Sequence, residues 1–397
     1  MFKFYQINND KDRLLYELKK IGVDNYALSL YEKGEIYCIK VLDLSPGQAN
    51  ILKQEALSLG GDVAVAKGSI NCKVEKTDAL VLLNKKSLKK FIKKLKVQPF
   101  NLKVLADELG EYLNLNDTNI LVARDKNIYL DEPQIVGILN TTPDSFSDGG
   151  CFTDNDSIER RLEYFLENDV KIVDIGGEST RPGSLPISAS EEISRIKYAL
   201  SKALEKDFIV SIDTYKSAVA DFALKEGAHI INDISGFTFD DKMVEVCSRY
   251  NAAVCLMHIK GTPKDMQNNP QYTNILEEIK LFLLNSAKKA MDFGIRKNSI
   301  ILDPGFGFGK TLKDNYIILK YLEEFKMLGY HLLVGVSRKS MIGNIIDKPP
   351  VERDIATKAI EFLAITKGAD FIRTHDIKTA KDIVKIGKYY KGISLDA

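Results

Sequence analysis

The sequence predicts an α/β chain that contains a closed (β/α)8 TIM barrel and an additional small N-terminal α/β domain. From residue 134 onward, eight short apolar runs alternate with longer amphipathic stretches. The runs are continuously apolar, which is typical of parallel strands buried on both faces. Nearly every run is followed by a polar or charged residue, as expected at the catalytic rim of a barrel.

The apolar runs and amphipathic stretches define the predicted elements of the barrel. An open, doubly wound sheet would share this alternation, but closing the sheet brings all of the polar strand ends to one rim. The predicted strands are residues 135–139, 172–175, 209–212, 229–231, 253–257, 300–302, 332–336 and 371–372. The predicted helices are residues 157–167, 190–204, 217–225, 242–249, 274–291, 314–325, 353–366 and 379–388.

Residues 1–115 lack this rhythm and predict a separate small α/β domain of unknown role, followed by a catalytic domain over residues 118–397. Within the first domain we expect strands at 26–31, 36–41, 63–66 and 79–83. Helices are expected to begin near Ser45 and Lys85. A proline follows Ser45, and Pro after Ser is a common helix opening. Residues 114–118 form the expected linker, and runs at 120–122 and 128–130 predict a hairpin that closes the bottom of the barrel.

Composition excludes several classes of function. The chain has 397 residues, enough for two domains, and its 56 basic and 55 acidic side chains leave almost no net charge. Neither nucleic acid nor a membrane is therefore an expected partner. The N-terminus lacks the apolar core of a secretory signal, and the five cysteines form no CxxC pair. We expect a cytoplasmic protein.

Eight sequence blocks carry the chemistry. The first, GILNTTPDSFSDGG from Gly137, resembles the opening motif of dihydropteroate synthases. The blocks DIGGESTRPG, SIDTYKS, INDISG, LMHIKG, LDPGFGFGK, GVSRKSMIG and RTHD follow in the order of that family. The resemblance covers about two-thirds of the chain and leaves the first domain outside it. Thr141 and Thr374 stand where the family usually has an aliphatic residue, and neither is expected to touch the chemistry.

The resemblance implies a transferase of folate biosynthesis and a target of sulfonamides. Such an enzyme condenses 6-hydroxymethyl-7,8-dihydropterin pyrophosphate with p-aminobenzoate, giving 7,8-dihydropteroate and pyrophosphate. It also implies a homodimer, and Mg²⁺ as cofactor, held mainly by pyrophosphate oxygens and water with a contact from Asn140. Magnesium bound largely through substrate phosphate is the usual pattern for this ion.

The resemblance also assigns residues to the pterin. Asp303 can accept two adjacent ring N–H groups, as a carboxylate does from arginine. Asn232 and Asp213 are matched to neighbouring ring atoms, and Lys339 to both the pterin and the aminobenzoate region.

Other residues are matched to the second substrate and to the leaving group. Ser337 is matched to the carboxylate of p-aminobenzoate, and Arg373 with His375 to the pyrophosphate. Loops 141–153 and 176–188 are expected to be mobile lids. The remaining predicted contacts come from the second lid, the pocket wall and the glycine-rich run: Thr180, Arg181, Pro182, Met257 and Phe306. We expect Asp213, Asp303, Lys339, Arg373 and His375 to be the catalytic set.

Two other functions fit parts of the pattern. A methyltetrahydrofolate:corrinoid methyltransferase would also hold a pterin with Asp and Asn residues at a barrel rim. It has no need of an aminobenzoate pocket or a pyrophosphate clamp, so residues 180–182, 337–339 and 373–375 count against it. A non-catalytic scaffold would be expected to have lost its site residues, which are intact here.

Overall fold

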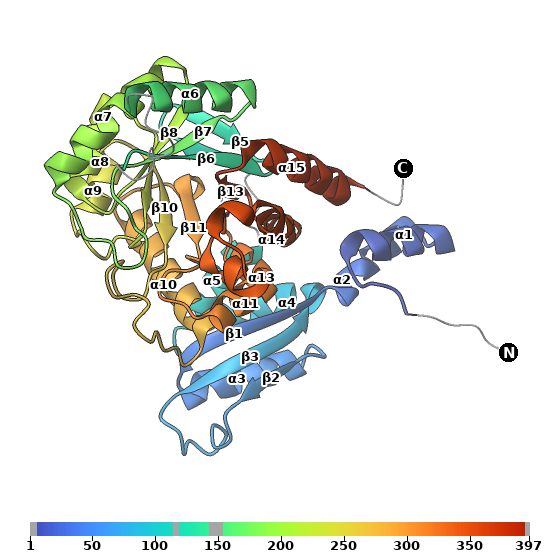
Figure 1. The fold of residues 1–397 in the computed structure, drawn as a ribbon. Coiled ribbons are helices and arrows are strands. Elements are labelled where there is room, and N and C mark those ends of the chain that lie inside the picture. The colour runs from blue at the N-terminus through green and yellow to red at the C-terminus, as the bar shows by residue number, and fades with distance from the viewer. Residues whose placement is uncertain (1–5, 114–118, 143–153, 394–397) are drawn as a thin grey trace. The chain divides into compact units, whose positions relative to one another are not determined.

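The structure is a computed structural model that describes residues 6–113, 119–142 and 154–393. The chain divides into two compact units (Figure 1). One comprises Met1–Asn116 with Ile393–Ala397, and the other Asp117–Gly392.

The larger unit is a closed barrel of eight parallel strands, which confirms the predicted TIM barrel and excludes the open sheet. Neighbouring strands around the barrel follow chain order, and β13 pairs with β6 to close the ring. The strands are β6 (Gln134–Asn140), β7 (Ile172–Gly176), β8 (Ile209–Asp213), β9 (Ile230–Asp233), β10 (Ala253–Met257), β11 (Ile300–Asp303), β12 (His331–Val334) and β13 (Phe371–Thr374).

Helices surround the barrel in Figure 1 and bury their apolar faces against the strands. The predicted helix at 314–325 is interrupted, so that α11 (Leu312–Lys320) and α12 (Glu323–Lys326) are separate. The short helix α13 (Ser340–Ile346) was not predicted, because its seven residues span too few turns for a clear apolar period. The other helices are α6 (Asp154–Glu167), α7 (Ala189–Glu205), α8 (Ser217–Glu226), α9 (Met243–Arg249), α10 (Ile275–Asp292), α14 (Asp354–Thr366) and α15 (Ile377–Gly392).

The predicted hairpin is present as β4 (Ile120–Ala123) and β5 (Lys126–Tyr129). Its apolar residues join the cluster that fills the lower barrel interior, so the hairpin closes the barrel at the strand N-termini. Arg124 in its turn donates to the backbone carbonyls of Leu224 and Ala228, at the C-terminal end of α8.

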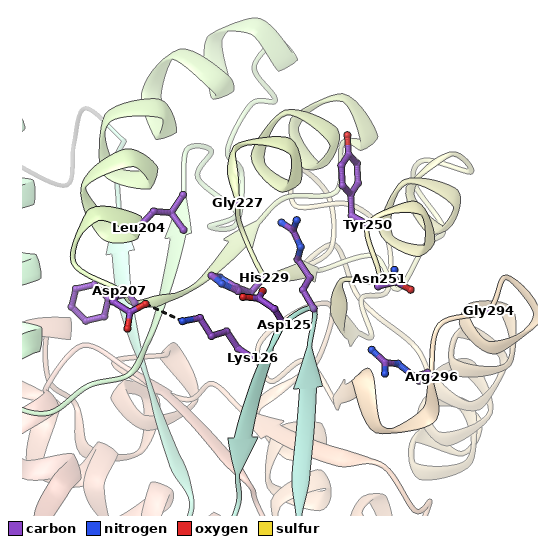
Figure 2. Close-up of a pocket in the computed structure, with 12 residues that line it drawn as sticks. Asp125, Lys126, Leu204, Asp207, Gly227, His229, Tyr250, Asn251, Gly294 and Arg296 are labelled. Atoms are coloured by element: carbon purple, nitrogen blue, oxygen red, sulfur yellow. Dashed lines mark hydrogen bonds and ion pairs between the residues drawn. The ribbon is translucent and has the colours of Figure 1, made fainter.

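Beside this turn lies a hollow of about 950 Å³ (Figure 2). Two of its cations are already engaged, since Arg124 satisfies helix carbonyls and Lys126 pairs with Asp207 at 2.9 Å. Phe208 and His229 line it just before their strands begin, so the hollow lies at the end of the barrel opposite to the C-terminal ends of the strands.

The N-terminal unit contains a three-stranded antiparallel sheet in the order β1-β3-β2. Along β3 buried and exposed residues alternate, so one face packs against helices and the other is open within this unit. Ser45 begins α3 with a capping box, as the sequence predicted. The elements are β1 (Ile36–Leu44), β2 (Asp62–Val65), β3 (Thr77–Asn84), α1 (Lys11–Ile21), α2 (Tyr31–Gly34), α3 (Pro46–Leu57), α4 (Lys85–Leu95) and α5 (Leu102–Leu113).

One strand prediction in this unit is wrong. Residues 26–31 are not extended: Asn25–Leu30 forms a 3-10 helix that leads directly into α2. The Ala27 N–H donates to the carbonyl of Asp24, and the Ser29 hydroxyl to that of Tyr26. None of the six helix residues is buried, so no contact with a sheet favoured an extended backbone here and local hydrogen bonds prevailed. The predicted linker at 114–118 lies outside the described residues.

Candidate active site

The strand register places four rim residues in one row. Asn140 is opposite Gly176, Gly176 opposite Asp213, and Asp213 opposite Asn232. A side chain at Gly176 would contact both Asn140 Oδ1 and Asp213, so these two polar groups converge over the glycine. The carboxyl ends of four successive strands therefore present an amide, a carboxylate and a second amide to one opening.

Arg373 lies at the centre of the rim and binds two carboxylates. Its Nε donates to Asp174 Oδ2 at 2.6 Å, and its terminal nitrogen donates to Asp213 Oδ2 at 2.8 Å. Asp174 is almost fully buried and also accepts from Ser211 and Asn232. Asp174 was assigned no role from the sequence, and the structure shows that it anchors Arg373.

The Asp213 carboxylate is incompletely satisfied. Its Oδ1 is buried and has no hydrogen-bond partner among the described residues. Burial is the main reason why the pKa of Asp213 is raised to about 7, and Arg373 opposes this shift. One guanidinium serves two buried carboxylates here, so the ion pair only partly offsets desolvation. Such an orphaned acceptor fits a ligand that presents an N–H group.

Asp303 and Lys339 form the second part of the rim. Asp303 Oδ1 accepts from the Gly305 N–H at 2.7 Å, and burial raises the pKa of Asp303. Lys339 donates to the Phe306 carbonyl and lies over the Phe308 ring, 4.6 Å from its centre. Burial lowers the pKa of Lys339 to about 8, although Asp303 favours its charged form. Asp303 raises the pKa of Arg373, and Arg373 lowers the pKa of Lys339. The three side chains therefore belong to the same polar cluster.

Ser337 and His375 lie in direct contact. Ser337 Oγ is 2.9 Å from His375 Nδ1 and accepts from the His375 backbone N–H at 3.2 Å. Burial, followed by Arg373, lowers the pKa of His375 to about 3, so the imidazole is neutral at physiological pH. Arg161 of α6 donates to the His375 carbonyl at 2.7 Å, a contact that no sequence motif indicated.

The predicted aromatic and apolar contacts are divided between rim and core. Met257 is in a small cluster at the rim with Ile234 and Phe308. Phe306, predicted to pack against flat substrates, is instead fully buried in the large cluster between barrel and helices. The chain turns at Gly305 and Gly307, which have positive φ, so that Phe306 is buried while the ring of Phe308 stays at the rim.

The second lid is partly tied down. Its Glu178 accepts from the Tyr215 hydroxyl at 2.5 Å and from Lys216 at 2.6 Å, both in the loop after β8. Further along, the Gly183 N–H donates to the Pro263 carbonyl. The predicted contact residues are accessible, with Thr180 half-buried and Arg181 and Pro182 exposed. Most of the first lid, residues 143–153, lies outside the described residues.

A divalent metal would find few protein ligands at this rim. Among the described residues, no group of three or more His, Cys, Asp or Glu side chains could hold a metal ion. The donors that do converge are the Asn140 amide oxygen and the Asp213 Oδ2 carboxylate oxygen, which also accepts from Arg373. This set fits a magnesium ion that takes most of its ligands from phosphate and water.

Comparison with known proteins shows to which protein family this chain belongs. Residues 136–375 match the family of pterin binding enzymes, which spans every rim residue described above. The dihydropteroate synthase of Haemophilus influenzae is 40% identical over 267 residues, covering 67% of this chain and 97% of that protein. A crystal structure of Yersinia pestis dihydropteroate synthase with a sulfonamide drug complex aligns at a TM-score of 0.66 and 40% identity, covering 69% of this chain and 100% of that one. The chain belongs to the dihydropteroate synthase family.

One relative extends over both units. The bifunctional dihydropteroate synthase/dihydropteroate reductase of Helicobacter pylori is 35% identical over 382 residues, covering 95% of this chain and 96% of that protein. The N-terminal unit is therefore shared with a protein that is named for two activities.

Proposed function

We propose that this chain condenses 6-hydroxymethyl-7,8-dihydropterin pyrophosphate with p-aminobenzoate, releasing 7,8-dihydropteroate and pyrophosphate. The observation that carries the proposal is the gathering of Arg373, Asp213 and the Asp303–Lys339 pair at one rim. Carboxylates are available to the ring and a guanidinium to the phosphates, as this substrate requires. A corrinoid methyltransferase is not favoured, because the relatives reported above are synthases.

The reaction breaks a carbon–oxygen bond to pyrophosphate and forms a carbon–nitrogen bond to the amine. Asp303, Asp213 and Asn232 hold the pterin ring through its N–H groups and stabilise positive charge that develops on it. Arg373 and the neutral imidazole of His375 donate to the departing pyrophosphate. These are electrostatic and positioning effects, with no covalent intermediate on the protein.

Magnesium belongs to this proposal as the substrate's counterion. Asn140 would hold it, next to Asp213, while pyrophosphate and water supply the remaining ligands. When bound, the ion neutralises charge on the leaving group.

A pyrophosphate-release assay tests the main proposal. Purified protein is given the dihydropterin pyrophosphate and magnesium, with and without p-aminobenzoate. Release that depends on both substrates, and that a sulfonamide inhibits competitively with p-aminobenzoate, is the expected result. Release independent of p-aminobenzoate would contradict it. Omission of magnesium with added chelator should abolish turnover, and Asn140→Ala should raise the magnesium concentration that is required.

A second activity, reduction of dihydropteroate, is proposed from the full-length match to the bifunctional Helicobacter pylori protein. The reaction adds a hydride and a proton across a carbon–nitrogen double bond of the dihydropterin ring. The hydride must come from an added donor of the reduced nicotinamide or reduced flavin class. Because solved synthases such as that of Yersinia pestis align along their whole length to 69% of this chain, the additional activity is assigned to the N-terminal unit.

Truncation separates the two activities. A chain of residues 119–397 should retain pyrophosphate release and lose donor-dependent reduction of dihydropteroate, whereas the full chain should show both. Each donor class is supplied in turn, and donor oxidation is followed spectroscopically. Equal reductase activity in the two chains would remove the assignment to the N-terminal unit.

We also propose a homodimer and a cytoplasmic setting. Large apolar side chains are exposed around α13 and α14, including Ile345, Val351 and Ile355, the last at 91% exposure. Such a group of exposed apolar residues is typical of an interface. The dimer should be seen by sedimentation, and Ile355→Asp should shift it to monomer.

The four cysteines in the described part of the chain are free, as expected in a reducing compartment. None of the helices described is long and apolar enough to cross a membrane.

A further inference from the structure

A buried ion pair lies behind the phosphate end of the rim. Lys358 and Glu361 are on α14, three residues apart, and both are almost completely buried. Lys358 Nζ donates to Glu361 Oε2 at 2.8 Å, to Thr374 Oγ1 at 3.0 Å and to the Asp376 carbonyl at 2.8 Å. All three ammonium protons therefore have acceptors, and two of those acceptors flank His375 in the chain.

This arrangement gives the hydrogen bonds a direction. An ammonium group can only donate, so Thr374 Oγ1 must accept from Lys358 and use its own proton elsewhere. Ser337 Oγ lies 3.4 Å from it in donor geometry. Ser337 also accepts from the His375 backbone N–H, so both of its lone pairs are occupied. Its single proton is left for His375 Nδ1, which is 2.9 Å away.

The hydrogen bond from Ser337 determines the tautomer of the His375 imidazole. A neutral histidine whose Nδ1 accepts a hydrogen bond carries its proton on Nε2. We propose, on the basis of the synthase function above, that Lys358 is a positioning residue. Through Thr374 and Ser337 it holds His375 in the Nε2–H tautomer, so that a neutral donor faces the departing pyrophosphate.

The surroundings support a positioning role. Burial is the main reason that the pKa of His375 is low, so its donor capacity depends on the tautomer and not on added charge. Burial raises the pKa of Glu361, and Lys358 and Thr374 oppose that shift. Glu361 is the other acceptor near the Thr374 hydroxyl, but its Oε1 makes no hydrogen bond among the described residues, whereas Ser337 Oγ lies in hydrogen-bond geometry.

The test observes the tautomer directly. Protein labelled with 15N-histidine is examined by long-range proton–nitrogen correlation near neutral pH. The chain has four histidines, and the signals of His375 are identified by their loss in His375→Gln. The wild-type protein should show protonated Nε2 and unprotonated Nδ1. A protonated Nδ1, or a charged ring, would overturn the proposal whatever the enzyme's activity.

Variants of Thr374 interrupt the series of hydrogen bonds that leads from Lys358 through Ser337 to His375, without removing a charge. Thr374→Val removes the hydroxyl and should move both ring signals toward values averaged between tautomers. Its kcat/KM for the dihydropterin pyrophosphate should fall about three- to tenfold, the size expected for one neutral hydrogen bond. Thr374→Ser keeps a hydroxyl and should restore both readouts. Unchanged ring signals in Thr374→Val would show that the hydroxyl does not act on Ser337, and would contradict the proposal that Lys358 positions His375.

Two controls keep the outcome interpretable. Lys358→Met alone leaves the Glu361 charge buried, so the double variant Lys358→Met/Glu361→Leu removes the whole pair. A folded double variant should show the same averaged ring signals as Thr374→Val. Ser286→Ala removes a buried hydroxyl of α10 and should change neither spectrum nor rate. If the wild-type enzyme releases no pyrophosphate, the synthase function fails, while the tautomer measurement still decides the structural claim.

Discussion

The Arg373 guanidinium donates to Oδ2 of Asp213 at 2.8 Å, while the other oxygen of the same carboxylate is buried without a partner. The pair thus joins the residue proposed to bind pyrophosphate to a residue proposed to bind the pterin ring. It also leaves Asp213 with an unused acceptor and a raised pKa.

The rate should depend on pH through Asp213 and Lys339. The pKa of Asp213 is raised to about 7, so its accepting carboxylate forms as pH rises through neutrality. The pKa of Lys339 is lowered to about 8, so its charge is lost above that pH. We expect a bell-shaped kcat/KM for the dihydropterin pyrophosphate, maximal between about 7 and 8.

Variants assign the two limbs of that profile. Lys339→Arg keeps its charge at high pH, so the falling limb should disappear even if the variant is slower. Asp213→Asn should lose the rising limb. His375, with a pKa near 3, should add no limb between pH 5 and 8. A rising limb that persists in Asp213→Asn would show that another group controls it.

Replacing Asp303 with Asn should reduce the stabilisation of the transition state more than the stability of the fold. The carboxylate is buried beside Lys339, and the amide would present a donor where the pterin also donates. The expected loss is about 1.5–3 kcal/mol, or roughly 10- to 150-fold in kcat/KM. Steady-state kinetics with varied dihydropterin pyrophosphate measure it. Wild-type turnover in Asp303→Asn would remove Asp303 from the site.

Two glycines give a matched pair for the backbone of the rim. Gly305 has a φ of 72°, and a Cβ there would lie 2.0 Å from the His258 carbonyl oxygen. Gly183 has a similar φ of 81° with nothing within 4 Å of its Cβ. Gly305→Ala must therefore displace the loop whose N–H binds Asp303, whereas Gly183→Ala adds only the strain of a left-handed alanine, about 1 kcal/mol.

Thermal unfolding and activity should separate these variants. Gly305→Ala is expected to lose several degrees of Tm together with most activity, and Gly183→Ala to change Tm only slightly. Equal effects would show that close approach to His258 is not what requires glycine at 305.

The barrel and most of its rim could be predicted from sequence because they depend on local patterns. Continuous apolar runs identify buried strands, and the residue after each run must lie at the rim once the sheet closes. The contacts made across the barrel were not predictable in this way. Arg373 and Asp174 are 199 residues apart, and their pairing depends on strand order and register. Likewise, burial of Phe306 follows from backbone turns at glycines, which no apolar period encodes.

The last prediction concerns Asp174, which accepts hydrogen bonds from Ser211, Asn232 and Arg373. Asp174→Ala would leave these donors without their acceptor and leave Arg373 facing Asp213 alone. Removing one partner of such a buried ion pair should cost about 3–5 kcal/mol of unfolding free energy. Asp207→Asn is the control, because Asp207 pairs with Lys126 at the exposed bottom of the barrel, where such pairs contribute about 0–1 kcal/mol. Urea unfolding measures both. A cost for Asp174→Ala no larger than that of the control would mean that Arg373 is held by Asp213 and its surroundings, and that Asp174 is dispensable as its anchor.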